Sequence, residues 1–524
     1  MTTCIDDVRI KHEVTEYYRY GMFSHKWEDN EPLFEQVIRM VVYELEASPT
    51  HDKLKMFCKI VQDTGLQWAW SDTCCINNAD HLVLEEALVA MFKWYQESAL
   101  TVVFLFDVLS LSRRGDLMRS IWNSRAWTLQ EYHASKVVRF YTKDWTPYMN
   151  LDIPNHKESP EIISEMEEVM GISAEVLMAL RPGLNDIREK LCLSSTRRTT
   201  LIEDAAYSLL GIFSMSLPVV YGEGDQALGR LLAQLLTSSG DTSIIAWTGR
   251  SGSLNSCLPS SMIVFKQLPP SHIPLAFATT EMEKLATIVL VCSLSSASVM
   301  KLYDQLHDLP LPLFVEQRLQ LPCLSFKLGA VTAARNAGEH LFRAQTDALG
   351  IVEIRTEEDL SRFSPLYLVH PWIDFLLDRQ PVGSIIETIP DEEHTEDQSY
   401  IGEQPLSSLP GPSNITSAAR KTQTGRLASR FGLPFGGLTA TRSKYAGSLP
   451  PLSSVSVEDK LSRVLQMITR LKQPFGALLL AKRPGKAAAY RRVAAETLIK
   501  VELEKITPAV LNILVSSACV LEVL

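Results

Sequence analysis

The stretch Thr101–Asp107, TVVFLFD, decides the fold of this chain. Apolar side chains occupy both of its alternating positions, so a strand formed here would bury both faces. A strand buried on both faces is typical of the middle of a parallel sheet that helices cover on each side. The segment therefore predicts an α/β domain with residues 101–107 as its central strand.

The surrounding sequence continues this pattern. Three other short apolar runs, residues 20–24, 67–71 and 136–141, predict further strands. Residues 81–95 place apolar side chains at i, i+3 and i+4 spacing, which predicts a helix, and Asp80 is a suitable N-cap for it. Strands that alternate with helical segments indicate a parallel sheet between about residues 17 and 145.

The rest of the chain changes character twice. Residues 158–240 predict mostly helices, one beginning at Pro160 and a long one over IEDAAYSLLGIF that ends near Gly211. The β-branched runs SIIAW, ATIVLVCSL, LPLFVEQRL and GIVEIRT then predict a β-rich domain over residues 251–380. The acidic, then Ser/Pro/Gly-rich residues 381–457 predict a disordered linker, and residues 458–524 predict strands and a helix that pack back on residues 251–380.

Composition narrows the classes of function. The 524 residues include 51 Lys+Arg and 61 Asp+Glu, and the net charge of −10 argues against nucleic-acid binding, which needs clustered positive charge. No run reaches the roughly 18 uncharged apolar residues of a membrane span. The opening MTTCIDDVRIKHEV lacks a hydrophobic signal segment, and nine cysteines are an odd and sparse set. These features predict a cytoplasmic protein without a disulfide framework, in which the sequon at Asn414 is unused.

Three local patterns invite a functional interpretation that a plainer one outweighs. GEGDQA at residues 222–227 fits a dinucleotide fingerprint, but its two acids and Pro218 favour a simple glycine turn before a helix. The adjacent Cys74 and Cys75 lack the spacing of zinc ligands, so packed thiols are the better interpretation and no metal site is expected. The basic residues near the C-terminus, among them Arg491 and Arg492, are expected on a solvated face.

SRAWTLQE at residues 124–131 is the strongest candidate for chemistry. On a helix, Trp127 and Glu131 would be i, i+4 neighbours, so the carboxylate would lie beside an indole near the end of the central strand. Such a pair suits glycosidic-bond cleavage, in which a carboxylate stabilises an oxocarbenium-like centre. Taken alone, the pattern favours a Trp that anchors the helix and a Glu that is paired with Arg125 or solvated.

Four blocks together carry a family resemblance. YGMFSHKW (residues 20–27), GLQWAWSDTCCIN (65–77), SRAWTLQEY (124–132) and TTLIEDAAYSLLGIF (199–213) resemble, in order and spacing, the signature blocks of the fungal heterokaryon-incompatibility (HET) domain family. The resemblance covers residues 15–250, which would form the HET domain with a helical extension. It implies fungal non-self recognition that triggers regulated cell death, and a fold like that of the Toll/interleukin-1 receptor (TIR) domain.

The resemblance also implies a site. Catalytic TIR domains hydrolyse NAD with a glutamate in a W-x-x-x-E segment, which places a catalytic role on Glu131. Trp127 would close the pocket, Ser24 and Asp72 would orient the substrate, and Arg125 would help to bind it. NAD would be a substrate, and no cofactor is expected.

An alternative remains open. The domain would then be a non-enzymatic interaction module that self-assembles or binds an incompatibility partner, and Glu131 would be structural. Lys26 and the basic segment SRRGDLMR (residues 112–119) depart from the TIR pattern.

Overall fold

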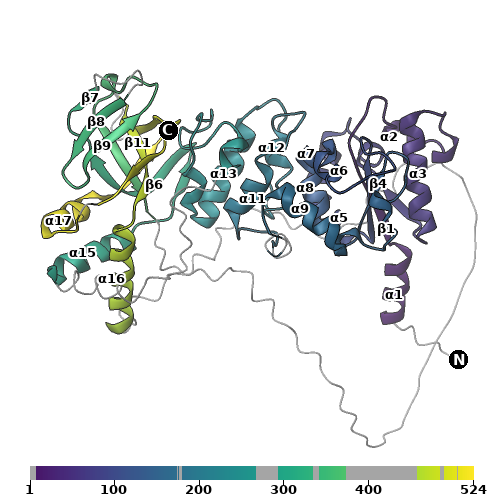
Figure 1. Cartoon of the computed structure of the whole chain (residues 1–524), viewed down its shortest axis with the longest axis horizontal. Coiled ribbons are helices and arrows are strands. Elements are labelled where there is room, and N and C mark those ends of the chain that lie inside the picture. Colours follow the sequence, from purple (N-terminus) through teal and green to yellow (C-terminus); the bar gives the residue numbers. More distant parts are fainter. Residues whose placement is uncertain are drawn as a thin grey trace, which may run out of the picture. The chain divides into compact units, whose positions relative to one another are not determined.

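A computed structural model (Figure 1) describes residues 7–173, 175, 180–266, 293–333, 341–372, 457–483, 489–503 and 505–524. Apart from residues 457–461, these residues belong to one compact unit, made of residues 1–381 and 462–524. The predicted disordered linker, except for Val457, lies outside the described residues, and so do the sequon and most of the run ATIVLVCSL. None of the helices within the described ranges is long and apolar enough to cross a membrane.

The N-terminal part contains the predicted parallel sheet. Its four strands lie in the order β2-β1-β3-β4 and all pair in parallel, with bounds β1 Tyr20–His25, β2 Trp68–Trp70, β3 Leu100–Leu105 and β4 Val138–Thr142. Every residue of β3 is buried, and β3 lies between β1 and β4. The prediction of a central strand buried on both faces is therefore confirmed.

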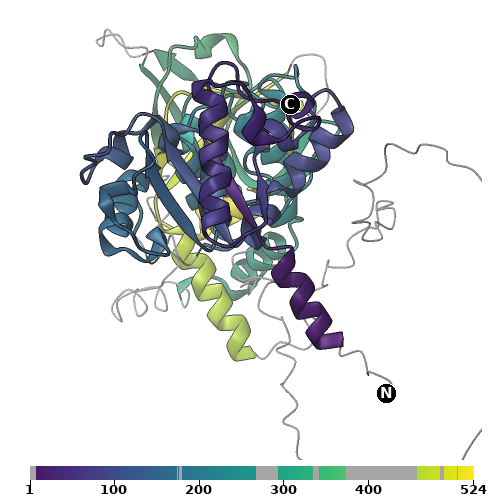
Figure 2. The same cartoon turned by 90° about the vertical axis from the view of Figure 1, so that its right-hand side faces the viewer.

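Alternate residues of these strands supply two separate cores. Met22, Val103 and Phe140 face α5 (His81–Glu97) and α8 (Trp127–Ala134), and belong to a large core shared with those helices. Their sequence neighbours Phe23 and Phe104 belong to a smaller core with α3 (Pro49–Asp63). Figure 2 shows α3, in dark purple, in front of the sheet. The period of two along each strand thus explains why both faces must be apolar.

The helix caps follow ordinary chemistry. The Asp80 carboxylate accepts hydrogen bonds from the backbone N–H groups of Leu82 and Val83 at the start of α5, as predicted. Ser48 caps α3 in the same way, and Ser159 caps α9 (Pro160–Met170), where Pro160 is the first residue as predicted. The shorter elements of this part are α1 Asp7–Tyr17, α2 Phe34–Val37, η1 Val42–Glu44, α4 Asp72–Cys75, α6 Asp116–Arg119, α7 Ile121–Ser124, η2 Tyr148–Asn150 and η3 His156–Glu158.

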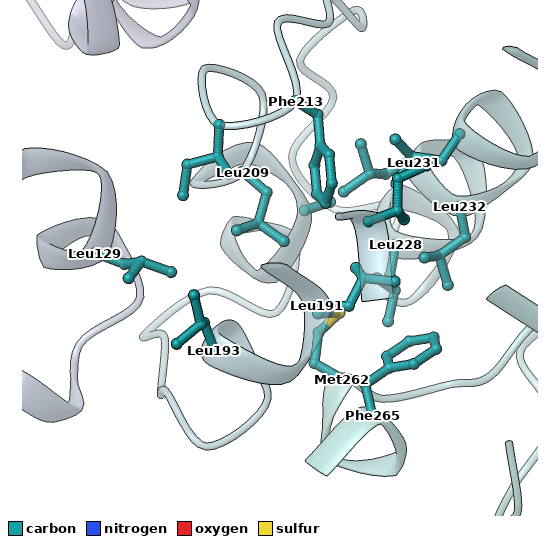
Figure 3. Packing of buried hydrophobic residues seen from close by; sticks show 14 of the residues in the cluster. Leu129, Leu191, Leu193, Leu209, Phe213, Leu228, Leu231, Leu232, Met262 and Phe265 are labelled. Atoms are coloured by element: carbon teal, nitrogen blue, oxygen red, sulfur yellow. The ribbon is translucent and has the colours of Figure 1, made fainter. Parts of the chain in front are cut away.

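A helical layer extends the large core. It comprises α11 (Ile187–Ser194), α12 (Asp204–Tyr207), α13 (Gln226–Ser239), η4 (Thr242–Ile245) and η5 (Met262–Lys266). Figure 3 shows Leu191, Phe213 and Leu231 meeting in this core, with Leu129 of α8 at its edge.

Two predictions made for this layer are wrong. Residues 202–213 do not form a long helix, because α12 ends at Tyr207 and turns continue to Ser214. Leu209, Leu210, Ile212 and Phe213 are all buried, so the segment has no polar face of the kind a surface helix presents. SIIAW is likewise not a strand, because its first three residues belong to the 3₁₀ turn η4 and its apolar residues Ile244, Ile245 and Trp247 are in the large core.

The C-terminal part is rich in strands. A seven-stranded sheet has the order β10-β11-β12-β14-β6-β5, β13 pairs with β11, and an additional β10–β6 pairing closes a ring of strands. A three-stranded sheet has the order β7-β8-β9. Strands that follow the linker therefore pair with strands that precede it. The bounds are α15 Ser296–His307, β5 Leu313–Val315, β6 Arg318–Lys327, β7 Val331–Ala333, β8 Leu341–Thr346, β9 Gly350–Arg355, η6 Leu360–Arg362, β10 Leu366–Pro371, α16 Val457–Leu471, β11 Phe475–Lys482, β12 Ala489–Val493, β13 Ile499–Val501, α17 Pro508–Ser517 and β14 Ala518–Val523.

Arg492 is not on a solvated face, which corrects the expectation for this residue, whereas Lys482, Arg483 and Arg491 are exposed as expected. It is buried, and its guanidinium donates to the carbonyl oxygens of Ile245 at 3.2 Å and Trp247 at 2.6 Å. The same group lies 4.0 Å from the centroid of the Trp247 ring. Since carbonyl oxygens and an indole face satisfy this cation, its partners could not be recognised from the local charge pattern.

Gly211→Ala tests the packing of the 202–214 segment. A Cβ atom at this position would lie 2.1 Å from Cβ of Phe92 on α5. Because the backbone fixes both Cβ atoms, relieving this clash requires the backbone of α5 or of the turn to shift. We expect a loss of about 1–3 kcal/mol in the free energy of unfolding, measured by urea denaturation. Lys93→Ala, on an exposed side chain next to Phe92, is the control and should change stability by less than about 0.5 kcal/mol. Equal effects of the two changes would contradict this packing.

Candidate functional site

The candidate site lies where the strand order of the parallel sheet reverses. In the order β2-β1-β3-β4, the chain moves to one side after β1 and to the other side at β3. In open α/β sheets, ligands bind outside the carboxyl ends of the strands at such a reversal. Ser24 is the penultimate residue of β1 and therefore lies at this point.

Three buried side chains are joined there by hydrogen bonds. Ser24 Oγ donates to Glu131 Oε2 at 2.5 Å, and Trp122 Nε1 donates to Ser24 Oγ at 2.8 Å. Ser24 comes from β1, Trp122 from α7 and Glu131 from α8. The interaction thus connects the sheet to α7 and α8, two of the helices between β3 and β4.

Glu131 is an acid in an unfavourable environment for its charge. Its residue is only 4% exposed, and burial together with the nearby Asp72 carboxylate raises its pKa to about 8. The hydrogen bond from Ser24 and the charges of Arg125 and Arg197 oppose this rise. At neutral pH the Glu131 carboxyl is therefore mostly protonated, and it ionises in a range useful for acid–base chemistry.

Asp72 lies at the end of β2 and begins α4. Its Oδ2 accepts a hydrogen bond of 2.7 Å from Trp27 Nε1, while its buried Oδ1 has no hydrogen-bond partner. Burial raises the pKa of Asp72, and the nearby His25 and the Trp27 indole oppose the rise. Asp72 therefore offers one free acceptor atom beside Glu131.

The segment that carries Trp27 is held by a buried cation. Lys53 Nζ donates to Glu31 and to Glu28 Oε2, the latter at 3.0 Å. It also lies 3.4 Å from the carbonyl oxygen of Lys26. The residues that follow β1 therefore fold over α3 and bring Trp27 to Asp72.

Two arginines follow Trp122 in the chain and lie near Glu131. Arg197 donates to the carbonyl of Arg125 at 3.0 Å and to Thr128 Oγ1 at 3.1 Å. Its guanidinium also acts electrostatically on Glu131, as does that of Arg125, whose Nε is buried without a hydrogen-bond partner. The positive charges of both arginines thus act on the Glu131 carboxyl group and lower its pKa.

The structure brings together four of the five residues named from the sequence and places the fifth differently. Ser24 and Glu131 are in contact, and Asp72 and Arg125 act on Glu131 through their charges. The Trp127 indole instead hydrogen-bonds the Asp204 carboxylate, and the indole that reaches Ser24 belongs to Trp122.

Sequence reasoning missed Trp122 and Arg197. Trp122 lies five residues before Trp127, in IWNSRAW, and only the fold distinguishes the two indoles. Arg197 lies two residues before the TTLIEDAAY block, but nothing in its local sequence points to a carboxyl group more than sixty residues away.

A side chain of the protein itself fills the anion position at the glycine-rich turn. The N–H groups of Gly222 and Gly224 donate to one Glu203 carboxylate oxygen, at 2.8 and 2.9 Å. Both glycines have positive φ, at 97° and 65°, which a residue with a side chain rarely adopts. Because a carboxylate fills the anion position, the turn fits the plain interpretation better than the dinucleotide one.

The remaining candidate features are a recess and a pair of adjacent cysteines. A recess of about 330 Å³, lined by Arg19, Thr64, Leu100 and Arg139 among others, lies at the opposite end of the strands. Cys74 is buried and Cys75 exposed. Within the described ranges, no group of three or more His, Cys, Asp or Glu side chains could hold a metal ion.

Comparisons with known proteins agree with the N-terminal blocks. Residues 20–113 match the family model described as heterokaryon incompatibility protein (HET). The chain is 31% identical over 223 residues to the vegetative incompatibility protein HET-E-1 of Podospora anserina, an alignment that covers 40% of this chain and 16% of that protein. The chain therefore spans less than a fifth of that relative. No solved structure matches the chain. The family match includes Ser24 and Asp72 and ends before Glu131.

Glu131→Gln tests the protonation of the site through stability. The folded-state pKa of about 8 lies above the value of about 4.3 expected for an unfolded chain, so the unfolded state holds fewer protons between these values. Wild-type stability should therefore fall as pH rises through this window, by at most about 1.4 kcal/mol per pH unit. Glutamine keeps an acceptor for Ser24 and cannot ionise.

Thermal unfolding at pH 5, 7 and 9 measures the effect. We expect the Tm of Glu131→Gln, relative to wild type, to rise from pH 5 to pH 9. Glu97→Gln, at an exposed position on α5, should show no such trend. A constant difference at all three pH values would contradict the raised pKa.

Proposed function

We propose that the chain, whose residues 20–113 match the HET family model, carries a HET domain and is a fungal non-self-recognition protein that triggers regulated cell death by hydrolysing NAD. The observation that carries the enzymatic part is the buried Glu131 carboxyl, hydrogen-bonded to Ser24 where the strand order reverses. A carboxyl group with a strongly raised pKa at such a position is a candidate for catalysis.

The chemistry required is cleavage of one glycosidic bond. The bond between C1′ of the ribose and the nicotinamide nitrogen breaks, and nicotinamide leaves as a neutral molecule with the bonding electrons. Water then adds to the cationic C1′ and loses a proton, so the products are ADP-ribose, nicotinamide and H⁺. Ionised Glu131 would stabilise the cation at C1′, as carboxylates do in other glycosidic cleavages. The Oδ1 atom of Asp72, which has no hydrogen-bond partner in the protein, would accept a hydrogen bond from a substrate hydroxyl.

A TIR-like fold is part of this proposal. The order β2-β1-β3-β4 equals the first four strands of the flavodoxin-like order, and helices cover both faces of the sheet. In this proposal Trp122, and not Trp127, is the indole at the reacting centre. Because Glu131 is buried, substrate entry requires some covering residues to move, and in this proposal they are those of the Trp27 segment, which is hydrogen-bonded to Asp72.

Nicotinamide release from NAD by the full chain tests the proposal. We expect the wild-type rate to rise between pH 6 and pH 9 with a midpoint near 8, because the carboxylate form is the active one. Ser24→Ala should move this midpoint upward, since the serine hydrogen bond lowers the pKa of Glu131. Glu131→Gln should reduce the rate by at least about 100-fold, whereas Glu97→Gln should keep it. Equal rates for wild type and Glu131→Gln would remove Glu131 from the mechanism.

A second candidate function, partner binding or self-assembly without catalysis, is favoured by one surface. Ile38, Met40, Val41 and Tyr43 are each about half exposed or more, and they lie close together in the chain, from the end of α2 to the middle of η1. Neighbouring exposed apolar side chains of this kind commonly mark an interaction site.

Ile38→Lys distinguishes this second function. If the 38–43 surface binds a second copy, the substitution should lower the apparent mass of the full chain measured by light scattering across concentrations. Leu111→Lys, at a more exposed apolar residue elsewhere, is the control and should leave the mass unchanged. A wild-type chain that stays monomeric throughout would argue against self-assembly.

A further inference from the structure

Two cysteines that are distant in sequence lie opposite each other in the C-terminal sheet. Cys323 on β6 pairs directly with Cys519 on β14, which is antiparallel to it. Directly opposite residues of an antiparallel pair point to the same face, with Cα atoms about 4.5–5.5 Å apart. A disulfide accepts Cα separations of about 4.4–6.8 Å, so this pairing meets its main geometric requirement.

The two thiols already interact. Both cysteines are in the free form, and the Cys323 thiol donates a hydrogen bond to the Cys519 sulfur. Both side chains belong to or pack against the same large core, which confirms that they share one face. Bond formation would therefore require little movement of the strands.

The two thiols differ in their burial and in the direction in which their pKa values are shifted. Cys519 is only partly buried, and the hydrogen bond from Cys323 lowers its pKa. Cys323 is fully buried, and the same hydrogen bond and its burial raise its pKa. An accessible thiol with a lowered pKa beside a second thiol is the arrangement found at oxidant-sensitive cysteines.

We propose that Cys519 and Cys323 form a reversible oxidation site, in which hydrogen peroxide converts this pair into a cross-strand disulfide. The Cys519 thiolate attacks one peroxide oxygen, and hydroxide leaves, so Cys519 becomes a sulfenic acid. The Cys323 sulfur then attacks the Cys519 sulfur, the S–S bond forms, and the sulfenic oxygen leaves as water with the thiol proton. Peroxide is the two-electron oxidant, and a dithiol such as dithiothreitol reverses the reaction.

The bond would join β14 to β6 close to the residues that link both strands to the helical layer. The carbonyl oxygens of Val523 and Leu524, at the end of β14, accept hydrogen bonds from Asn255 and Ser256, which follow η4 in the chain. β6 approaches the same residues, since Asn255 also donates to the carbonyl of Gln317 at 2.9 Å. Oxidation would therefore hold both strands at the place where the sheet meets residues 255–256.

Other thiols in the described ranges serve as comparisons. Cys74 and Cys75 are consecutive on α4, so their Cα atoms lie about 3.8 Å apart, closer than an unstrained disulfide allows. Cys257 is fully buried near Cys323, and its pKa is raised to about 11, so it is a poor first target for peroxide.

Mass spectrometry of the full chain tests the site directly. The reduced protein is treated with hydrogen peroxide, free thiols are alkylated, and trypsin digestion is done without reduction. We expect a disulfide-linked product of residues 319–327 and 506–524, which dithiothreitol separates. The product should be absent from Cys519→Ser and retained in Cys257→Ser, and Tm of the oxidised wild type should exceed that of the reduced form.

Three outcomes would overturn the proposal. The first is alkylation of both cysteines after peroxide treatment. The second is conversion of Cys519 to sulfinic acid while Cys323 stays alkylated. The third is a link from Cys323 to Cys257 in place of Cys519. Since the wild-type result and its reversal by dithiothreitol need no variant, misfolding of a serine variant would not affect the conclusion.

Discussion

The interaction on which the N-terminal half depends is the hydrogen-bonded set formed by Trp122, Ser24 and Glu131. It connects β1, at the middle of the parallel sheet, with α7 and α8. Burying a carboxyl group is costly when it is charged, and the protein meets this constraint by keeping Glu131 mostly protonated near neutral pH. The Asp72 carboxylate raises the pKa of Glu131, and the charge of Arg197 lowers it. The same residues that stabilise the fold thus set the chemistry available at the strand ends.

Much of this fold could be predicted from periodicity alone. The run Thr101–Asp107 predicted the buried central strand, and Asp80 and Pro160 marked the starts of two helices, because these signals depend on local backbone chemistry. The prediction of a long helix at residues 202–213 was wrong, because Gly211 packs against Phe92 and the segment is buried on several sides. Burial of that kind is decided by distant residues and leaves no period of 3.6 to detect.

The candidate site shows the same division. Ser24, Asp72 and Glu131 lie at strand ends or on the following helix, so the order of the elements was sufficient to group them. The sequence could not decide whether Trp122 or Trp127 contacts Ser24. The two residues lie only five positions apart, on α7 and α8, and only packing orients each indole. Arg492 is a comparable case on the C-terminal side. Its partners are backbone carbonyls, which no sequence pattern identifies.

The central claim, that Glu131 carries a proton at neutral pH, can be measured without any assumption about substrate. The infrared carbonyl band of a protonated carboxyl, taken as the difference between wild type and Glu131→Gln, can be followed from pH 4 to pH 10. With the raised pKa of Glu131, this band should disappear with a midpoint near pH 8. A midpoint near the ordinary glutamate value of about 4.3 would contradict it.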